Sequence, residues 1–284
     1  MPFEPALLDS ETLLHARGPV YDGIQDCLRI QAHATPRGAL GRLFGRCPLD
    51  PEARQTFPQA VAEGAVARVL TTLSPEWTVL HALPSADGVD GRNVDGRNVI
   101  DHILIGPSGL YSVTTVEHGG RPVVVDGGSL TIGRKRTEAL AECRQETIRA
   151  AGLLSARVRA SVEITPLIVL VAPVSMKMGK THGIITVLPA TDVRDWLAAG
   201  QRVHTDGALT LYERALREQG EWSSVARVTD DTIRHINRFE RLQREVHAAS
   251  VRARIWSRVA VSGVIAASAG AIAVVGLVLI PLAE

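Results

Sequence analysis

The sequence predicts an α/β domain, built on a central mixed β-sheet flanked by helices, followed by a C-terminal transmembrane helix. Short apolar segments typical of strands alternate with segments of helical periodicity between residues 58 and 200. Hydrophobic residues make up 45% of the 284 residues and charged residues 21%, as in a folded protein. Residues 259–282 contain no charged side chain, and about 20 apolar residues suffice to span a bilayer.

The first 57 residues predict a loosely structured lead-in. Prolines and glycines are scattered through it, and short amphipathic pieces occur around residues 20–30 and 39–44. We expect one or two short helices there. The first 14 residues include acidic residues and prolines but no continuous apolar core, so we do not expect a secretory signal peptide.

A helix and a strand are predicted next. Val61, Ala65 and Val69 recur at helical spacing, which predicts a helix over 58–73, and residues 77–83 predict a strand. A tandem repeat follows, in which VDGRN at 89–93 occurs again at 94–98. Its two Asp-Gly pairs predict a turn-rich surface loop. Two interpretations stay open: a tolerated duplication, or a polar flap in which Arg92 and Arg97 contact phosphate.

Residues 99–116 form the most informative pattern, a predicted β-hairpin. Two apolar runs, 99–105 and 110–116, are separated by the tight turn Gly-Pro-Ser-Gly. A carboxylate near the start of one strand, here Asp101, and an acid-x-Lys on its neighbour can face the same pocket. Such a set holds Mg²⁺ and activates water for attack on a phosphodiester.

The remaining elements continue the alternation of strands and helices. Strands are predicted at 122–125, 129–132, 166–173 and 184–188, and helices at 137–158, 191–198, 209–219 and from residue 230 onward.

The order Ile-Asp-His, Gly-Pro-Ser-Gly-Leu-Tyr and then Gly-Gly before a further strand resembles the nuclease-related domain (NERD) family. That family is a distant branch of the PD-(D/E)XK fold, so the resemblance implies a restriction-endonuclease-like sheet over roughly residues 57–197. It also implies an acid-x-Lys at the end of the second strand. Thr114 stands there at the acid position and Val116 at the lysine position, so an anionic ligand and a cationic donor are both missing.

The resemblance further implies which residues would remain of a nuclease centre. Glu63, in the stretch QAVAE, matches a glutamate on the helix before the hairpin, and Asp101 and Gln145 complete the remnant set. Lys135 is the best substitute for the absent ammonium. Asp101 and Glu63 would be the metal ligands, and Mg²⁺ the cofactor, only if the centre is active; otherwise we expect no cofactor.

Structural interpretations of the same residues stay open. Asp101 is equally well explained as a strand-start residue that is hydrogen-bonded to a turn. Glu117 is the nearest alternative acid, but its odd offset from Thr114 directs it to the opposite face of a regular strand. His102 and His118 flank the hairpin and have the chemistry of metal ligands, although histidines so separated are more often surface or turn residues.

Charge, cysteine spacing and the absence of known motifs argue against several classes of function. The chain has 31 Lys and Arg against 30 Asp and Glu, a net charge of +1, which gives no global electrostatic case for binding nucleic acid. Its three cysteines have neither the pairing of a disulfide framework nor zinc-ligand spacing. No phosphate-binding loop, HExxH or GxSxG motif is present. Nucleotide hydrolysis, zinc proteolysis and serine esterase chemistry therefore have no support.

The C-terminal region predicts how the protein lies at the membrane. Seven arginines precede the predicted span at positions 234, 238, 241, 244, 252, 254 and 258, and Glu284 carries the only side-chain charge after it. Basic flanks stay cytoplasmic, so we expect a single-pass protein of the cell membrane with a cytoplasmic N-terminal domain. Small residues at four-residue spacing, such as Gly263, Ala267 and Ala271, suggest a homodimer through the span.

We therefore expect four segments: the lead-in at 1–57, a NERD-like domain at 58–200, a helical extension with a basic juxtamembrane helix at 201–256, and the transmembrane helix at 257–282. The expected role is binding or scaffolding, with nucleic acid or another protein as the partner. The alternatives are an active Mg²⁺-dependent DNA endonuclease with a rearranged site, and a structural membrane protein that assembles through its span.

Overall fold

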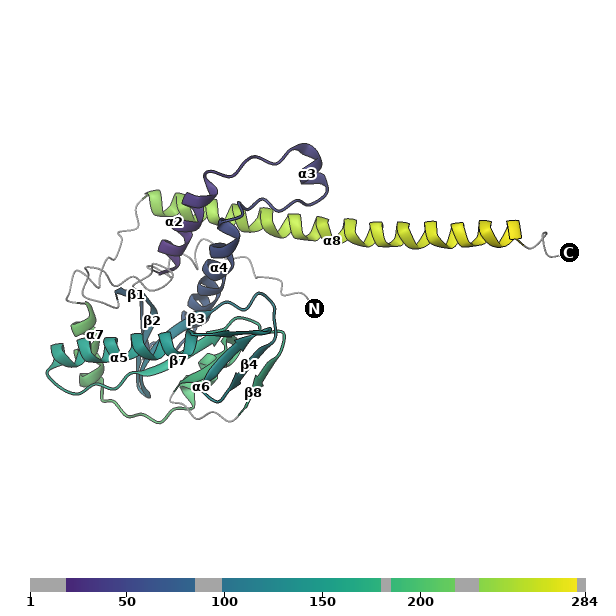
Figure 1. Ribbon diagram of the computed structural model, residues 1–284. Helices are drawn as coiled ribbons and strands as arrows, with labels where there is room; N and C mark the ends of the chain where they lie inside the picture. Colours follow the sequence, from purple (N-terminus) through teal and green to yellow (C-terminus); the bar gives the residue numbers. More distant parts are fainter. Residues whose placement is uncertain (1–18, 85–98, 180–184, 218–229, 280–284) are drawn as a thin grey trace.

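The computed structural model describes residues 19–84, 99–179, 185–217 and 230–279 and has the predicted mixed α/β architecture (Figure 1). Its main sheet has the strand order β1-β2-β3-β7-β9. The first three strands are antiparallel, whereas β3, β7 and β9 are parallel. These strands are β1 (Thr78–Pro84), β2 (Val99–Gly106), β3 (Gly109–Val116), β7 (Thr165–Leu170) and β9 (Thr186–Pro189). The predicted hairpin is therefore confirmed.

A second sheet, with the order β6-β5-β4-β8, is present beside the main one, whereas the sequence predicted a single sheet. Its strands are β4 (Val123–Asp126), β5 (Ser129–Ile132), β6 (Lys135–Thr137) and β8 (Met176–Met178). The sequence did not predict β6, because this exposed edge strand has no need of alternating apolar residues. Gly133, with a φ of +65°, makes the turn that leads from β5 into β6.

Helices cover both faces of the main sheet. On one face, α4 (Ala53–Leu70) and α6 (Val193–Ala198), which follows the 3₁₀ turn η1 (Ala190–Asp192), pack on β2, β3 and β7. On the other face lie α5 (Ala139–Val158) and α7 (Asp206–Arg217). The buried side of α5 includes Cys143, Ala150 and Leu154. Ile148 of the same helix is 61% exposed.

A separate helical core joins the N-terminal segment to the C-terminal helix. Residues 19–57 contain α2 (Pro19–Gln31) and α3 (Ala39–Leu43), and α8 (Asp230–Leu279) is 50 residues long. Side chains of α2, α4 and the first part of α8 form one buried cluster that includes Cys27, Phe57 and Phe239. Beyond this cluster α8 extends away from the rest of the protein (Figure 1).

Two predictions concern segments that are largely outside the described residues. The repeat at 89–98, with Arg92 and Arg97, lies outside them entirely. From residue 263 onward the predicted span is described only as the backbone of α8, which ends at Leu279. Within the part of the chain that the structure describes, none of the helices has the length and apolar character needed to cross a membrane.

Candidate functional site

The predicted site residue Asp101 lies on β2, beside the end of β3. Because His102 pairs with Val113, Asp101 comes next to Thr114, at the position where the family has an acid. One carboxylate oxygen of Asp101, Oδ2, accepts a hydrogen bond from the backbone N–H of Thr115 at 2.7 Å. Asp101 is therefore hydrogen-bonded to the neighbouring strand.

Glu63 approaches the same stretch of β3 from α4. Its side chain is 1% exposed, and its Oε1 accepts a hydrogen bond from Nε2 of Gln59 at 2.9 Å. The same Nε2 donates to the backbone oxygen of Thr115 at 2.9 Å, and Oε1 of Gln59 accepts from the N–H of Glu117 at 3.2 Å. Glu63 and Asp101 are thus linked through Gln59 and the Thr115 backbone.

Uncharged side chains, Thr114 and Val116, occupy the positions where the family has an acid and a lysine. Val116 packs against an apolar cluster that includes Val123, Leu140 and Ile168. The Thr114 hydroxyl lies beside the Cys143 thiol of α5. The pKa of Cys143 is raised to about 11, mainly by burial and also by the charges of Glu146 and Asp101, whereas contacts with the Thr114 and Thr147 hydroxyls act to lower it.

Two other predicted site residues lie elsewhere. Gln145 is exposed on α5, whereas the next residue, Glu146, is 7% exposed and faces Cys143. Lys135 is exposed at the start of β6, in the second sheet. The structure therefore brings Glu63, Asp101, Thr114 and Val116 to the end of β3, and it places Gln145 on the outer surface of α5.

The two histidines beside the hairpin have different environments. Nε2 of His118 donates to the backbone oxygen of Val171 at 2.7 Å and its Nδ1 accepts from the N–H of Gly120 at 3.1 Å, so this ring ties the turn after β3 to the end of β7. His102 is fully buried and pairs with His81 across β1 and β2, with 2.7 Å between their Nδ1 atoms. One of these nitrogens must be protonated and the other must accept.

A magnesium ion bound in the manner of the family needs acidic oxygens from both strands and a nearby ammonium. The residues at the end of β3 offer Glu63 and Asp101 but a hydroxyl and an apolar side chain at the other two positions, so they do not fit that set. No group of three or more His, Cys, Asp or Glu side chains suited to a metal ion occurs in the ranges that the structure describes.

Gln59 and Glu146 are the site residues that the sequence did not single out. Gln59 belongs to the stretch QAVAE, one helical turn before Glu63, and this i, i+4 spacing was the available signal. Glu146 lies three residues after Cys143 on the buried stripe of α5, a spacing that also could have identified it.

Comparisons with known proteins support the resemblance in one part of the chain. No curated protein and no solved structure matched the chain. Residues 58–171 match the model of the nuclease-related domain family, NERD. This range holds most of α4, all of β1 to β7 and α5, and with them every site residue discussed above. Residues 58–171 thus form a nuclease-related, NERD-like segment.

Proposed function

We propose that this protein is a membrane-anchored, cytoplasmic NERD-like domain whose nuclease centre is degenerate and whose role is binding or scaffolding. The observation that carries the proposal is the end of β3, where Thr114 lies next to Asp101 and Val116 packs among apolar side chains. Loss of one charged group that stabilises a transition state costs about 3 kcal/mol, or more than a hundredfold in rate. Here both members of the acid-x-Lys pair are neutral.

A plasmid-nicking assay with Mg²⁺ or Mn²⁺ tests the loss of catalysis. The full-length protein should give no metal-dependent cleavage above that of Asp101→Ala. Asp195→Ala is the matched control, because it removes an exposed carboxylate from α6, far along the chain from the hairpin. Cleavage by the wild type and by Asp195→Ala that disappears in Asp101→Ala would favour the rival function, an active endonuclease that uses Glu63, Asp101 and Lys135.

Membrane anchoring is the second part of the proposal. It is supported by the uncharged stretch at 259–282 and by the seven arginines that precede it. The domain then lies on the cytoplasmic side of the cell membrane, and small residues in the span favour a homodimer.

The partner of the domain is nucleic acid or another protein. A gel shift on duplex DNA at increasing salt distinguishes the two, because phosphate contacts weaken as counterions compete. Binding at low salt that falls steeply with added salt supports nucleic acid. Absence of a shift at low salt leaves a protein partner.

A further inference from the structure

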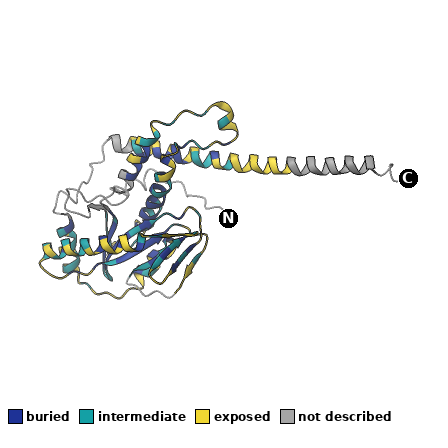
Figure 2. Cartoon of the chain, viewed as in Figure 1, coloured by how far each residue is buried: buried dark blue, intermediate teal, exposed yellow. Residues whose placement is uncertain are grey.

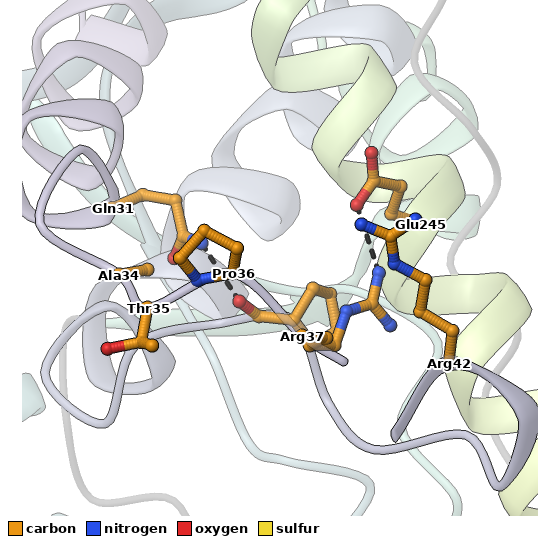
Figure 3. Close-up of a pocket in the computed structure, with 8 residues that line it drawn as sticks. Gln31, Ala34, Thr35, Pro36, Arg37, Arg42 and Glu245 are labelled. Carbon is orange, nitrogen blue, oxygen red and sulfur yellow. Dashed lines mark hydrogen bonds and ion pairs between the residues drawn. The ribbon is translucent and has the colours of Figure 1, made fainter. Parts of the chain in front are cut away.

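Residues 32–50, which we call the α3 lobe, form a loop around α3 that is fastened to the side of α8 (Figure 1). Nη2 of Arg37 forms an ion pair with Glu245 at 3.0 Å, on the wall of a pocket of about 400 Å³ between the lobe and α8 (Figure 3). Further along, Nη1 of Arg252 donates to the backbone oxygen of Arg42 at 3.2 Å. The lobe thus has a defined position on the helix.

The tip of the lobe contacts α8 just before the predicted span. Nε1 of Trp256 donates to the backbone oxygen of Leu43 at 3.0 Å, and the rings of Phe44 and Trp256 meet edge to face with centroids 4.9 Å apart. The N–H of Trp256 is therefore bonded to the lobe, while 38% of the side chain stays exposed.

Large apolar side chains are concentrated on this surface. Leu40 is 70% exposed, and Figure 2 shows exposed residues on α3 and on the part of α8 that precedes its grey end. Of the twelve large hydrophobic residues that are exposed in the described chain, five belong here, namely Leu40, Leu43, Phe44, Ile255 and Trp256, and two more, Val259 and Val261, lie at the start of the predicted span. Exposed apolar groups gathered in one place mark an interaction surface.

The same surface is basic, apart from Glu245, which pairs with Arg37, and Asp50, the last residue of the lobe. Residues 32–49 and 246–262 contain six arginines and not a single Asp or Glu. The arginines are at positions 37, 42, 46, 252, 254 and 258. Arginine and tryptophan beside exposed leucine and phenylalanine are the composition of a segment that lies at the boundary between head groups and acyl chains.

We propose that the α3 lobe is a second membrane contact, which inserts Leu40, Leu43 and Phe44 into the cytoplasmic surface of an anionic bilayer while Arg42, Arg46 and Arg252 bind lipid phosphates. The lobe contacts Trp256, the residue before the predicted transmembrane helix at 257–282, so an inserted span brings it to the level of the head groups. This inference rests on the proposed membrane anchoring. It adds a fixed orientation of the domain on the membrane surface.

The depth of single fluorescent labels tests the inference in the full-length protein reconstituted into vesicles that contain 30% phosphatidylglycerol. Cys47→Ser removes the one partly exposed thiol, since Cys27 and Cys143 are buried. An environment-sensitive dye is then attached at Leu40→Cys, at Val203→Cys or at Ala266→Cys. Val203 is the matched control, because it is an aliphatic residue 65% exposed before α7.

Nitroxide lipids should quench the label at 266 strongly and the label at 40 at least twofold more than that at 203. If the label at 40 behaves like that at 203 while the label at 266 is quenched, the lobe inference is wrong and the anchor stands. If the label at 266 is not quenched, both proposals fail.

The role of charge is tested by the lipid and by the arginines. Replacing phosphatidylglycerol by phosphatidylcholine, or introducing Arg42→Glu with Arg46→Glu, should reduce quenching of the label at 40 at least twofold and leave that at 266 unchanged. Equal quenching in both lipids would contradict recognition of anionic lipid. A response of the label at 40 to duplex DNA, without quenching by nitroxide lipid, would assign the surface to nucleic acid and overturn the inference.

Discussion

Individual residues at the end of β3 show how two carboxylates are held in place by hydrogen bonds. Asp101 accepts the N–H of Thr115, and Gln59 binds the Thr115 oxygen, the Glu117 N–H and Glu63. Hydrogen bonds to charged groups contribute about 1.5–3 kcal/mol each. A carboxylate bonded in this way stabilises the sheet whether or not a metal ion is present.

The buried pair of His81 and His102 should make stability depend on pH. Burial lowers the pKa of His81 to about 4, and burial together with the charge of His81 lowers the pKa of His102 well below 6.5. Below pH 6.5 the unfolded chain takes up protons that the native state refuses, so stability is lost as the pH falls from about 6.5 toward 4. The slope for each histidine approaches about 1.4 kcal/mol per pH unit.

Chemical denaturation at pH 7, 6 and 5 measures this effect. His81→Leu with His102→Leu should flatten the decline of the unfolding free energy over that range. His33→Leu, which changes an exposed histidine, should leave the decline as in the wild type. Equal slopes in all three proteins would mean that the buried pair is not the source.

Sequence patterns located some site residues and missed others for a geometric reason. Asp101 and Glu63 belong to short motifs with fixed offsets, so their positions at the end of β3 could be predicted. Gln145 and Glu146 differ by one helical position, which rotates the side chain by about 100°. Only packing against β3 decides that Glu146 is buried and Gln145 exposed.

At the scale of elements, buried strands were predictable and exposed ones were not. β7 carries nearly continuous apolar residues because helices cover both faces. The observed bounds of β2 and β3 lie within one residue of the predicted ones, whereas β7 ends three residues earlier than predicted. β6 and β8 are short, largely exposed strands, and only their pairing with β5 and β4 defines them. Pairing between distant segments has no local signal in a single sequence.

The docking of the α3 lobe on α8 should depend on Gly45. This residue has a φ of +74°, and a Cβ atom there would collide with the backbone of Ala249 and Ala253. Gly45→Ala should therefore weaken the docking by about 1–3 kcal/mol, through strain and overpacking. Trypsin should then cut at Arg42 and Arg46 several-fold faster than in the wild type.

Gly38→Ala provides the control for that experiment. Gly38 precedes α3 with a φ of −65°, and a Cβ atom there meets nothing within 4 Å. Its cleavage rate should equal that of the wild type. Unchanged cleavage in Gly45→Ala would show that the lobe does not depend on the close approach to α8.

For the whole molecule, the helical core makes the NERD-like segment and α8 one structure. Phe239 of α8 is fully buried, and its ring lies 5.4 Å from that of Phe57, at the start of α4. The same α4 carries Glu63 to β3. Packed side chains therefore connect α8 with the helix that borders the candidate site.

Phe239→Ala tests this coupling between α8 and the domain. The substitution removes a buried aromatic ring and should lower the unfolding free energy of the full-length protein by about 3–5 kcal/mol, measured by chemical denaturation in detergent. Phe44→Ala removes the same group from a site that is 49% exposed and should cost far less. If both variants unfold alike, α8 rests on the domain without stabilising it, and α8 and the candidate site are energetically independent.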